Sequence, residues 1–124
     1  MSASGDRELL AELFAPLGGV SFRRMFGGTG IFRDGLMLAM LNSDGVLRFK
    51  ADAETAPAFE AEGCEQWAPD MRGRGVTAMP YWRAPERLFD EPEEFAAWAR
   101  RAYEVALRSA KPKARKARAR PKPV

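Results

Sequence analysis

The fold is decided by residues 20–51, which read VSFRRMFGGTGIFRDGLMLAMLNSDGVLRFKA. Apolar and polar side chains alternate along much of this stretch, and a period of two is typical of β-strands with one buried face. Asp34-Gly35 interrupts the pattern and is a strong signal for a two-residue hairpin. Asn42-Ser43-Asp44-Gly45 supplies the next turn. The stretch therefore predicts an antiparallel meander of about four strands.

A helix is predicted immediately before this meander, from Asp6 to Ala15. Its four apolar residues fall on one stripe, which we expect to cover the sheet. Pro16 and Gly18-Gly19 end it. The stripe consists of Leu9, Leu10, Leu13 and Phe14.

After the meander, a short helix is predicted from Asp52, its N-cap, to Glu62, with Phe59 as the buried anchor. Two more strands are predicted at Gln66–Met71 and Val76–Trp82, joined by an Arg/Gly loop. Pro80 has no N–H to donate to a neighbouring strand, so the second of these is expected to be an edge strand or to end early.

A long final helix is predicted from the motif Asp90-Glu91-Pro92-Glu93, in which Asp90 and Glu93 would form a capping box. We expect this helix to run to about Ala110. Its predicted buried stripe consists of Phe95, Trp98, Ala99, Ala102 and Ala106.

These patterns predict an α+β domain over residues 1–110. We expect an antiparallel β-sheet of five to six strands in a meander, an N-terminal helix, a short middle helix and a long C-terminal helix. Residues 111–124 hold seven basic residues, no acid and no aromatic residue, so we predict a disordered basic tail. The whole sequence has a net charge of +3, and without the seven tail cations residues 1–110 are at −4.

The tail is the candidate nucleic-acid-binding segment, since its cations could neutralise phosphates without recognising a particular base sequence. The alternative is a tail that only aids solubility. Arginines of the folded part could also converge on one face, namely Arg23, Arg24, Arg72, Arg74 and Arg83. The tentative nucleic-acid-binding residues of the tail are Lys111, Lys113, Arg115, Lys116, Arg118, Arg120 and Lys122.

The sequence contains no histidine and one cysteine, Cys64. Ser–His–Asp and Cys–His catalysis are therefore excluded, as are zinc sites made of histidine or of several thiolates. We interpret Cys64 as a small, partly buried residue, and Glu60, Glu62 and Glu65 as a solvated acidic face. We expect no catalytic residue, no cofactor and no metal.

Two glycine-containing segments could suggest phosphate binding. Gly27-Gly28-Thr29-Gly30 opens a strand and lacks the Lys-Ser/Thr of a phosphate loop, so we interpret it as a turn or bulge. Arg72-Gly73-Arg74-Gly75 is interpreted as a solvated hairpin loop.

The longest nearly uncharged stretch, Gly35 to Leu41, is too short to span a bilayer. Met1 to Arg7 lacks the apolar core of a signal peptide. A single cysteine fits a reducing compartment, so we expect a cytoplasmic protein with no membrane partner.

Several motifs together resemble the N-terminal domain of the TfoX/Sxy competence regulators, over about Leu9 to Leu107. The opening Arg24-Met25-Phe26-Gly27-Gly28, followed by Gly30-Ile31-Phe32, is the most specific part. The other matching pieces are Asp34-Gly35, Asp44-Gly45, Leu47, Phe49, Lys50, Phe59, Gly63, Met79-Pro80-Tyr81-Trp82, Pro85 and Trp98-Ala99.

This resemblance implies a regulator that promotes transcription, with the cAMP receptor protein as the family's implicated partner, and it supplies no catalytic residue. We therefore expect a non-enzymatic regulatory protein that acts through a protein partner, with a transcription factor as one candidate. Two alternatives stay open. One is a nucleic-acid-binding accessory protein that uses the tail, and the other is an enzyme with an Arg/Glu-lined site, which the missing histidine disfavours.

Overall fold

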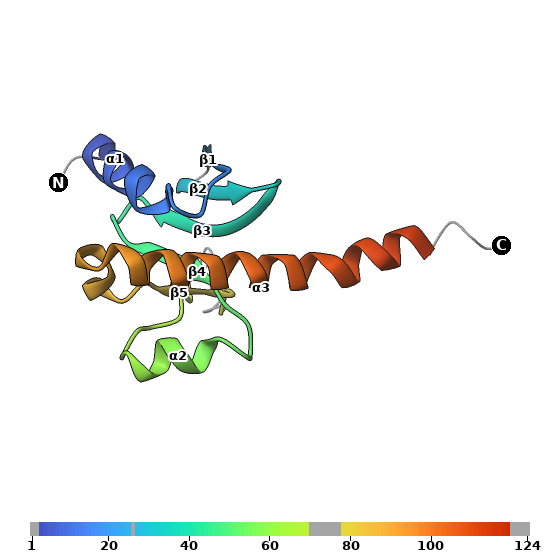
Figure 1. Ribbon diagram of the computed structural model, residues 1–124. Coiled ribbons are helices and arrows are strands. Elements are labelled where there is room, and N and C mark those ends of the chain that lie inside the picture. The colour runs from blue at the N-terminus through green and yellow to red at the C-terminus, as the bar shows by residue number, and fades with distance from the viewer. Residues whose placement is uncertain (1–2, 26, 70–77, 120–124) are drawn as a thin grey trace.

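The computed structural model describes the backbone of residues 3–25, 27–69 and 78–119, and the side chains of residues 7–25, 27–69 and 78–110. Three α-helices, one short 3-10 helix and five strands form an α+β fold in this part of the chain (Figure 1). The elements are, in order, α1 (Ala3–Phe14), β1 (Val20–Met25), β2 (Gly28–Arg33), β3 (Leu36–Asn42), β4 (Leu47–Lys50), α2 (Ala56–Ala61), β5 (Tyr81–Arg83), η1 (Glu86–Asp90) and α3 (Pro92–Ala119).

The five strands form one antiparallel sheet in the order β1-β2-β3-β4-β5. The predicted meander is therefore confirmed, and each of its hairpins falls where the sequence places a turn. Asp34 and Gly35 both adopt positive φ between β2 and β3, as a two-residue hairpin requires.

One row of side chains across the sheet forms the centre of the core. Its members lie directly opposite one another on neighbouring strands and point toward the helices. Successive residues of a strand point to opposite faces of the sheet. The register that pairs these residues therefore also determines which residues lie on the other face. The row consists of Phe22, Ile31, Ala39, Phe49 and Trp82.

Helices α1 and α3 cover this row (Figure 1). The ring of Phe95 in α3 lies edge-on to Phe14 of α1 and to Phe49 of β4, with centroid distances of 5.0 and 5.5 Å. All three rings are fully buried. Leu9, which the sequence placed in the buried stripe of α1, is instead exposed, because the helix faces the sheet with Leu10, Leu13 and Phe14.

Helix α2 begins at Ala56, four residues later than the predicted cap. Asp52 caps the preceding turn instead, since its Oδ1 accepts from the N–H groups of Glu54 and Thr55 at 3.1 and 3.2 Å. The helix ends as predicted at Gly63. There the Cys64 N–H donates to the Phe59 carbonyl, which closes a Schellman motif.

The predicted strands at Gln66–Met71 and Val76–Trp82 are shorter than expected within the described residues. Gln66 forms only an isolated bridge with Trp82, and β5 covers Tyr81–Arg83. Pro80 cannot donate to a ladder, which limits the pairing in this region. Residues 70–77, including the predicted Arg/Gly loop, lie outside the described residues.

Helix α3 differs from its prediction at both ends. The N–H of Phe95 donates to the Glu91 carbonyl, so Glu91 is the N-cap and Asp90 closes η1. Pro92 occupies the first helical position, where an N–H would have no partner within the helix, so proline is tolerated there. The helix therefore begins one residue later than predicted.

At its other end, α3 continues to Ala119 and not to about Ala110, so the helix includes the first part of the basic segment (Figure 1). Alanine, lysine and arginine favour helix, whereas Pro112 within it lacks the N–H that would donate to the Arg108 carbonyl. Residues 120–124 lie outside the described part of the chain. That residues 1–110 fold independently of the basic segment 111–124 stays a prediction. Within the described residues, no helix is long and apolar enough to cross a membrane.

Replacing Trp98 should test the predicted stripe of α3. Trp98 is buried and lies edge-on to Phe59 at 4.9 Å, so Trp98→Ala should lower the free energy of unfolding by about 3–5 kcal/mol through lost burial and a new cavity. Asp90→Ala is the control, because Asp90 is exposed and is not the N-cap, and it should cost well under about 1 kcal/mol. Urea unfolding of both variants measures the difference. Similar small losses in both would contradict the packing described.

Candidate functional site

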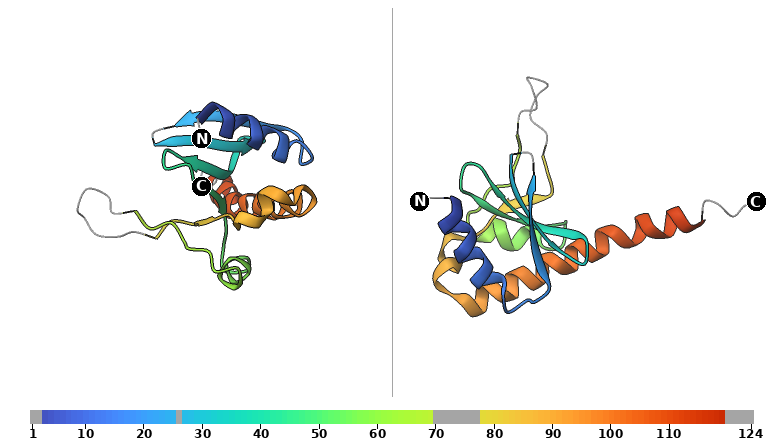
Figure 2. Two further views of the ribbon diagram at one scale, coloured as in Figure 1. Left: turned by 90° about the vertical axis from the view of Figure 1, so that its left-hand side faces the viewer. Right: turned by 90° about the horizontal axis from the view of Figure 1, so that it is seen from above.

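The register that builds the core also builds a second row, on the face of the sheet away from α1 and α3. Its five members lie directly opposite one another, one on each strand. Figure 2 shows both of these helices on the same side of the sheet. We call the other side the open face. Its central row consists of Arg23, Gly30, Met40, Arg48 and Arg83.

An apolar cluster lies at the centre of the open face, where Gly30 leaves room for it. A Cβ on Gly30 would lie within about 3 Å of the Met25 sulfur, the Phe32 ring and the Met37 sulfur, so these three side chains converge over the glycine. Met25 is 41% exposed, and the others are partly buried. We define the methionine patch as Met25, Phe32, Met37, Met40 and Trp67.

The patch contains a small hollow of about 50 Å³. Met25 and Met40 line it from the sheet, and Trp67 lines it from the segment that precedes β5. Gly28 completes it, and its backbone passes so close to β3 that a Cβ would lie 2.2 Å from the Leu41 carbonyl oxygen. The interpretation of the glycine segment as a turn is confirmed, because Gly27 adopts positive φ between β1 and β2. Gly28 and Gly30 in addition allow close approach of a strand and of side chains.

Three cations of the open face lie over aromatic rings. Arg23 lies 5.1 Å from the centre of the Phe32 ring, and Arg48 lies 5.5 Å from that of Trp67. Lys50 lies 5.2 Å from the centre of the Tyr81 ring. Each pair gains from the attraction between a cation and the negative face of a ring. Arg23 and Arg48 are thus held close to the methionine patch, because Phe32 and Trp67 belong to it.

Arg48 and Tyr81 are further constrained. Arg48 Nη1 donates to Asn42 Oδ1 at 2.6 Å, and its Nη2 reaches the Asp44 carboxylate at 3.4 Å. Burial raises the pKa of Tyr81 to about 12, so its phenol stays neutral at physiological pH. Arg48 is thus held by an amide and a carboxylate, and Lys50 lies over a neutral phenol ring.

Charge is segregated between the sheet and the rest of the domain. The five described strands contain six arginine or lysine residues and no aspartate or glutamate. Since residues 1–110 have a net charge of −4, the helices and connections of the domain hold the acidic excess. The strand cations are Arg23, Arg24, Arg33, Arg48, Lys50 and Arg83.

Of the arginines that could have converged on one face, Arg23 and Arg83 do lie in one row. Arg24 follows Arg23 on β1 and therefore lies on the opposite face. Arg72 and Arg74 lie outside the described residues. The methionine patch and Arg48 were missed from the sequence, because their proximity depends on which strands are neighbours.

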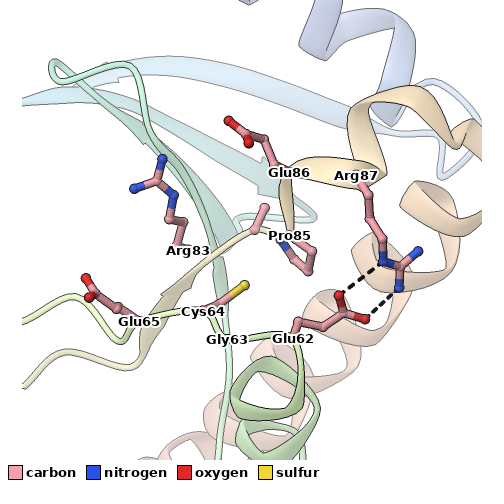
Figure 3. A pocket seen from close by; sticks show the side chains of 9 residues that line it. Glu62, Gly63, Cys64, Glu65, Arg83, Pro85, Glu86 and Arg87 are labelled. Atoms are coloured by element: carbon pink, nitrogen blue, oxygen red, sulfur yellow. Dashed lines mark hydrogen bonds and ion pairs between the residues drawn. The ribbon is translucent and has the colours of Figure 1, made fainter.

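A second, shallow groove of about 480 Å³ lies between the end of α2 and the chain after β5 (Figure 3). Arg87 dominates it by ion pairing. Its Nη2 donates to Glu62 at 2.7 Å and to Glu94 at 2.9 Å. These bonds lower the pKa of Glu62 and bring the pKa of Glu94 to about 2. Both carboxylates are therefore ionised at physiological pH, which suits an ion-pair network better than acid–base catalysis.

Cys64 lies in the same groove (Figure 3). Burial, and then the charge of Glu62, raise the pKa of its thiol. A nucleophilic cysteine needs a lowered pKa, so the environment opposes that role. Among the residues that the structure describes, no cluster of three or more potential ligand side chains could hold a metal ion.

Five of the seven tentative nucleic-acid-binding residues lie in a part of the chain apart from both sites. Lys111, Lys113, Arg115, Lys116 and Arg118 are in the last part of α3, which projects beyond the sheet (Figure 1). Arg120 and Lys122 lie outside the described residues. Their role in binding stays a prediction.

The structure defines a small α+β domain whose open face is cationic and contains a methionine patch. A family model described as the TfoX N-terminal domain matches residues 12–106, and the chain belongs to this family. The match begins within α1, includes all five strands and ends within α3. No curated protein matches the sequence.

The two glycines of the open face should differ in their tolerance of a side chain. In Gly28→Ala the new Cβ would meet the backbone of β3, which cannot move without disturbing the sheet. In Gly30→Ala it would meet the ends of side chains that can rotate. We expect a cost of about 1–3 kcal/mol for Gly30→Ala and a clearly larger one for Gly28→Ala. Thermal unfolding of both variants measures this. A Gly28→Ala variant as stable as the original protein would contradict the described approach of β2 to β3.

Proposed function

We propose that this protein is a non-enzymatic regulator, of the transcription or competence type, that acts by binding a protein partner in the cytoplasm. The observation that carries the proposal is its membership of the TfoX N-terminal domain family across the folded body. Named members of this family regulate transcription and are not known as enzymes.

The composition of the open face supports a binding role. Methionine, aromatic residues and arginine are enriched at protein interfaces, whereas aspartate and glutamate are depleted. The open face combines the methionine patch with Arg23, Arg48 and Arg83, and the strands below it contain no acidic residue. A transcription factor is the class of partner that the family relationship favours.

The chemistry of the groove supports the same proposal. The sequence contains no histidine, the thiol of Cys64 has a raised pKa, and the carboxylates of Glu62 and Glu94 are paired with Arg87. These features favour binding over nucleophilic or acid–base catalysis. An enzyme with an Arg/Glu-lined site is therefore not our preferred reading of the Arg87 cluster.

Transcript profiling tests the proposed function. Deleting the gene from its native host should change the levels of a defined set of transcripts, and expression of the full chain should restore them. Cys64→Ser should restore them equally well, because no reaction is expected to depend on the thiol. Unchanged transcripts after deletion would contradict the proposal, and failure of Cys64→Ser alone would point to chemistry at the thiol.

A second candidate function is accessory binding of nucleic acid through the basic segment 111–124. Seven cations fall within this segment, while the body is at −4, so phosphate should be attracted to the segment and repelled by the average charge of the body. With no aromatic residue for stacking, such binding would be weak and indifferent to sequence.

A salt titration tests this candidate. If the segment neutralises about five phosphates of duplex DNA, the slope of log K against log salt should be near −4 to −5. Ending the chain after Ala110 should abolish binding and change the thermal midpoint little. A full-length variant with glutamine at the seven basic positions controls for any loss of folding. If either variant keeps tight binding, arginines of the body are responsible.

A further inference from the structure

We propose that the open face docks an acidic protein segment, with an apolar side chain in the methionine patch and flanking carboxylates on the arginines. This inference rests on the proposed function and adds the chemistry of the partner. It identifies the partner by what the surface can bind: an apolar group at the centre and negative charges on either side.

The apolar centre follows from the exposure and geometry of the patch. Met25 is one of two large apolar side chains that are clearly exposed in the described residues, and it borders the hollow of about 50 Å³. Methionine is flexible and polarizable, so it adapts to an incoming apolar group better than branched residues do. Trp67 also lines the hollow and adds an aromatic surface to it. This hollow suits the tip of one apolar side chain.

The charges follow from the row across the sheet. Arg23 on β1 and Arg48 on β4 flank Gly30 and Met40 in the same row. Neighbouring strands are about 4.8 Å apart, so the two arginine positions are separated by about 14 Å. Arg23 is exposed and lies over the Phe32 ring. Arg48 lies over the Trp67 ring, donates to Asn42 and pairs with the Asp44 carboxylate at 3.4 Å, with 13% of its side chain exposed, so a carboxylate of the partner would take the place of Asp44 there. The five described strands hold no carboxylate, and the carboxylate that the structure places beside Arg48 is that of Asp44 in the turn between β3 and β4.

This spacing defines a simple ligand. In an extended segment, residues i and i+4 are about 13 Å apart and point to the same side as residue i+2. A segment of the form Glu-X-Leu-X-Glu would therefore place its leucine over the methionine patch and its two carboxylates near Arg23 and Arg48.

Single-stranded nucleic acid fits the same face less well. Sequence-indifferent binding of bases relies on aromatic rings that are free to stack. Here Phe32, Trp67 and Tyr81 each have a cation of this chain over the ring, and Tyr81 is only 5% exposed. The methionines offer apolar contact but no planar surface. The face therefore favours an acidic protein segment.

Fluorescence anisotropy with the full chain tests the inference. The probe is a fluorescein-labelled peptide centred on Glu-Ser-Leu-Ser-Glu, with matched peptides that carry lysine for glutamate or serine for leucine. We expect the acidic peptide to bind in a salt-dependent manner and both matched peptides to bind at least about tenfold more weakly.

Adjacent residues of β1 provide matched variants. Arg23→Glu should weaken binding of the acidic peptide by about tenfold, whereas Arg24→Glu should change it by less than about twofold. Both residues are exposed and both variants change the net charge equally, but only Arg23 lies on the open face. Met25→Ser should also weaken binding, because it removes the exposed apolar wall of the hollow.

Four results would overturn the inference: no binding of the acidic peptide, equal losses in Arg23→Glu and Arg24→Glu, equal binding of the lysine peptide, or binding of single-stranded oligothymidine that only Arg23→Glu abolishes. The last result would assign the face to nucleic acid. Transcript profiling separates this inference from the proposed function. If the Arg23→Glu protein restores all transcripts in the deleted strain, the regulatory function stands and the docking face is wrong.

Discussion

The register of the antiparallel sheet is the constraint on which the rest of this structure depends. It aligns Phe22, Ile31, Ala39 and Phe49 in one row beneath the rings of α1 and α3. Shifting a strand by one residue would exchange its two faces. Burial of this row therefore fixes the other row on the opposite face of the sheet, namely Arg23, Gly30, Met40 and Arg48. The core and the candidate binding surface are therefore products of the same pairing, and packing of the aromatic residues keeps the arginines in place.

The glycines of the family motif take on a physical meaning in this arrangement. Gly28 allows β2 to approach the backbone of β3, and Gly30 lets Met25, Phe32 and Met37 fold over the strand. A glycine in a strand usually weakens it, and its presence often marks a close approach. Here the approach creates the apolar part of the open face. The motif that identifies the family is thus structural, as the sequence predicted, and it also shapes the surface that we propose for binding.

The sequence predicted those features that depend on local patterns. The hairpins after Arg33 and Asn42, the anchor Phe59 and the buried face of α3 needed only periodicity and turn residues. The alternation of buried and exposed residues is broken in β3, because a register shift between β2 and β3 allows the consecutive residues Leu38 and Ala39 both to be buried. The end of α3 was predicted too early, at about Ala110, because many charged residues indicate exposure to solvent but do not prevent helix formation. The open face could not be derived, since it depends on which strands are neighbours, although the absence of acidic residues from each strand was already visible in the sequence.

The separation of charge has a consequence for how an acidic partner would approach. Residues 1–110 have a net charge of −4, whereas the whole chain, with the basic segment 111–124, is at +3. At physiological ionic strength, however, charges are screened beyond about 8 Å, which is less than the thickness of a sheet covered by helices. A partner near the surface therefore responds to the face it meets and not to the net charge. The cations of the strands would hold it at the open face, and the same charges that give a modest affinity would thereby select this face of the domain.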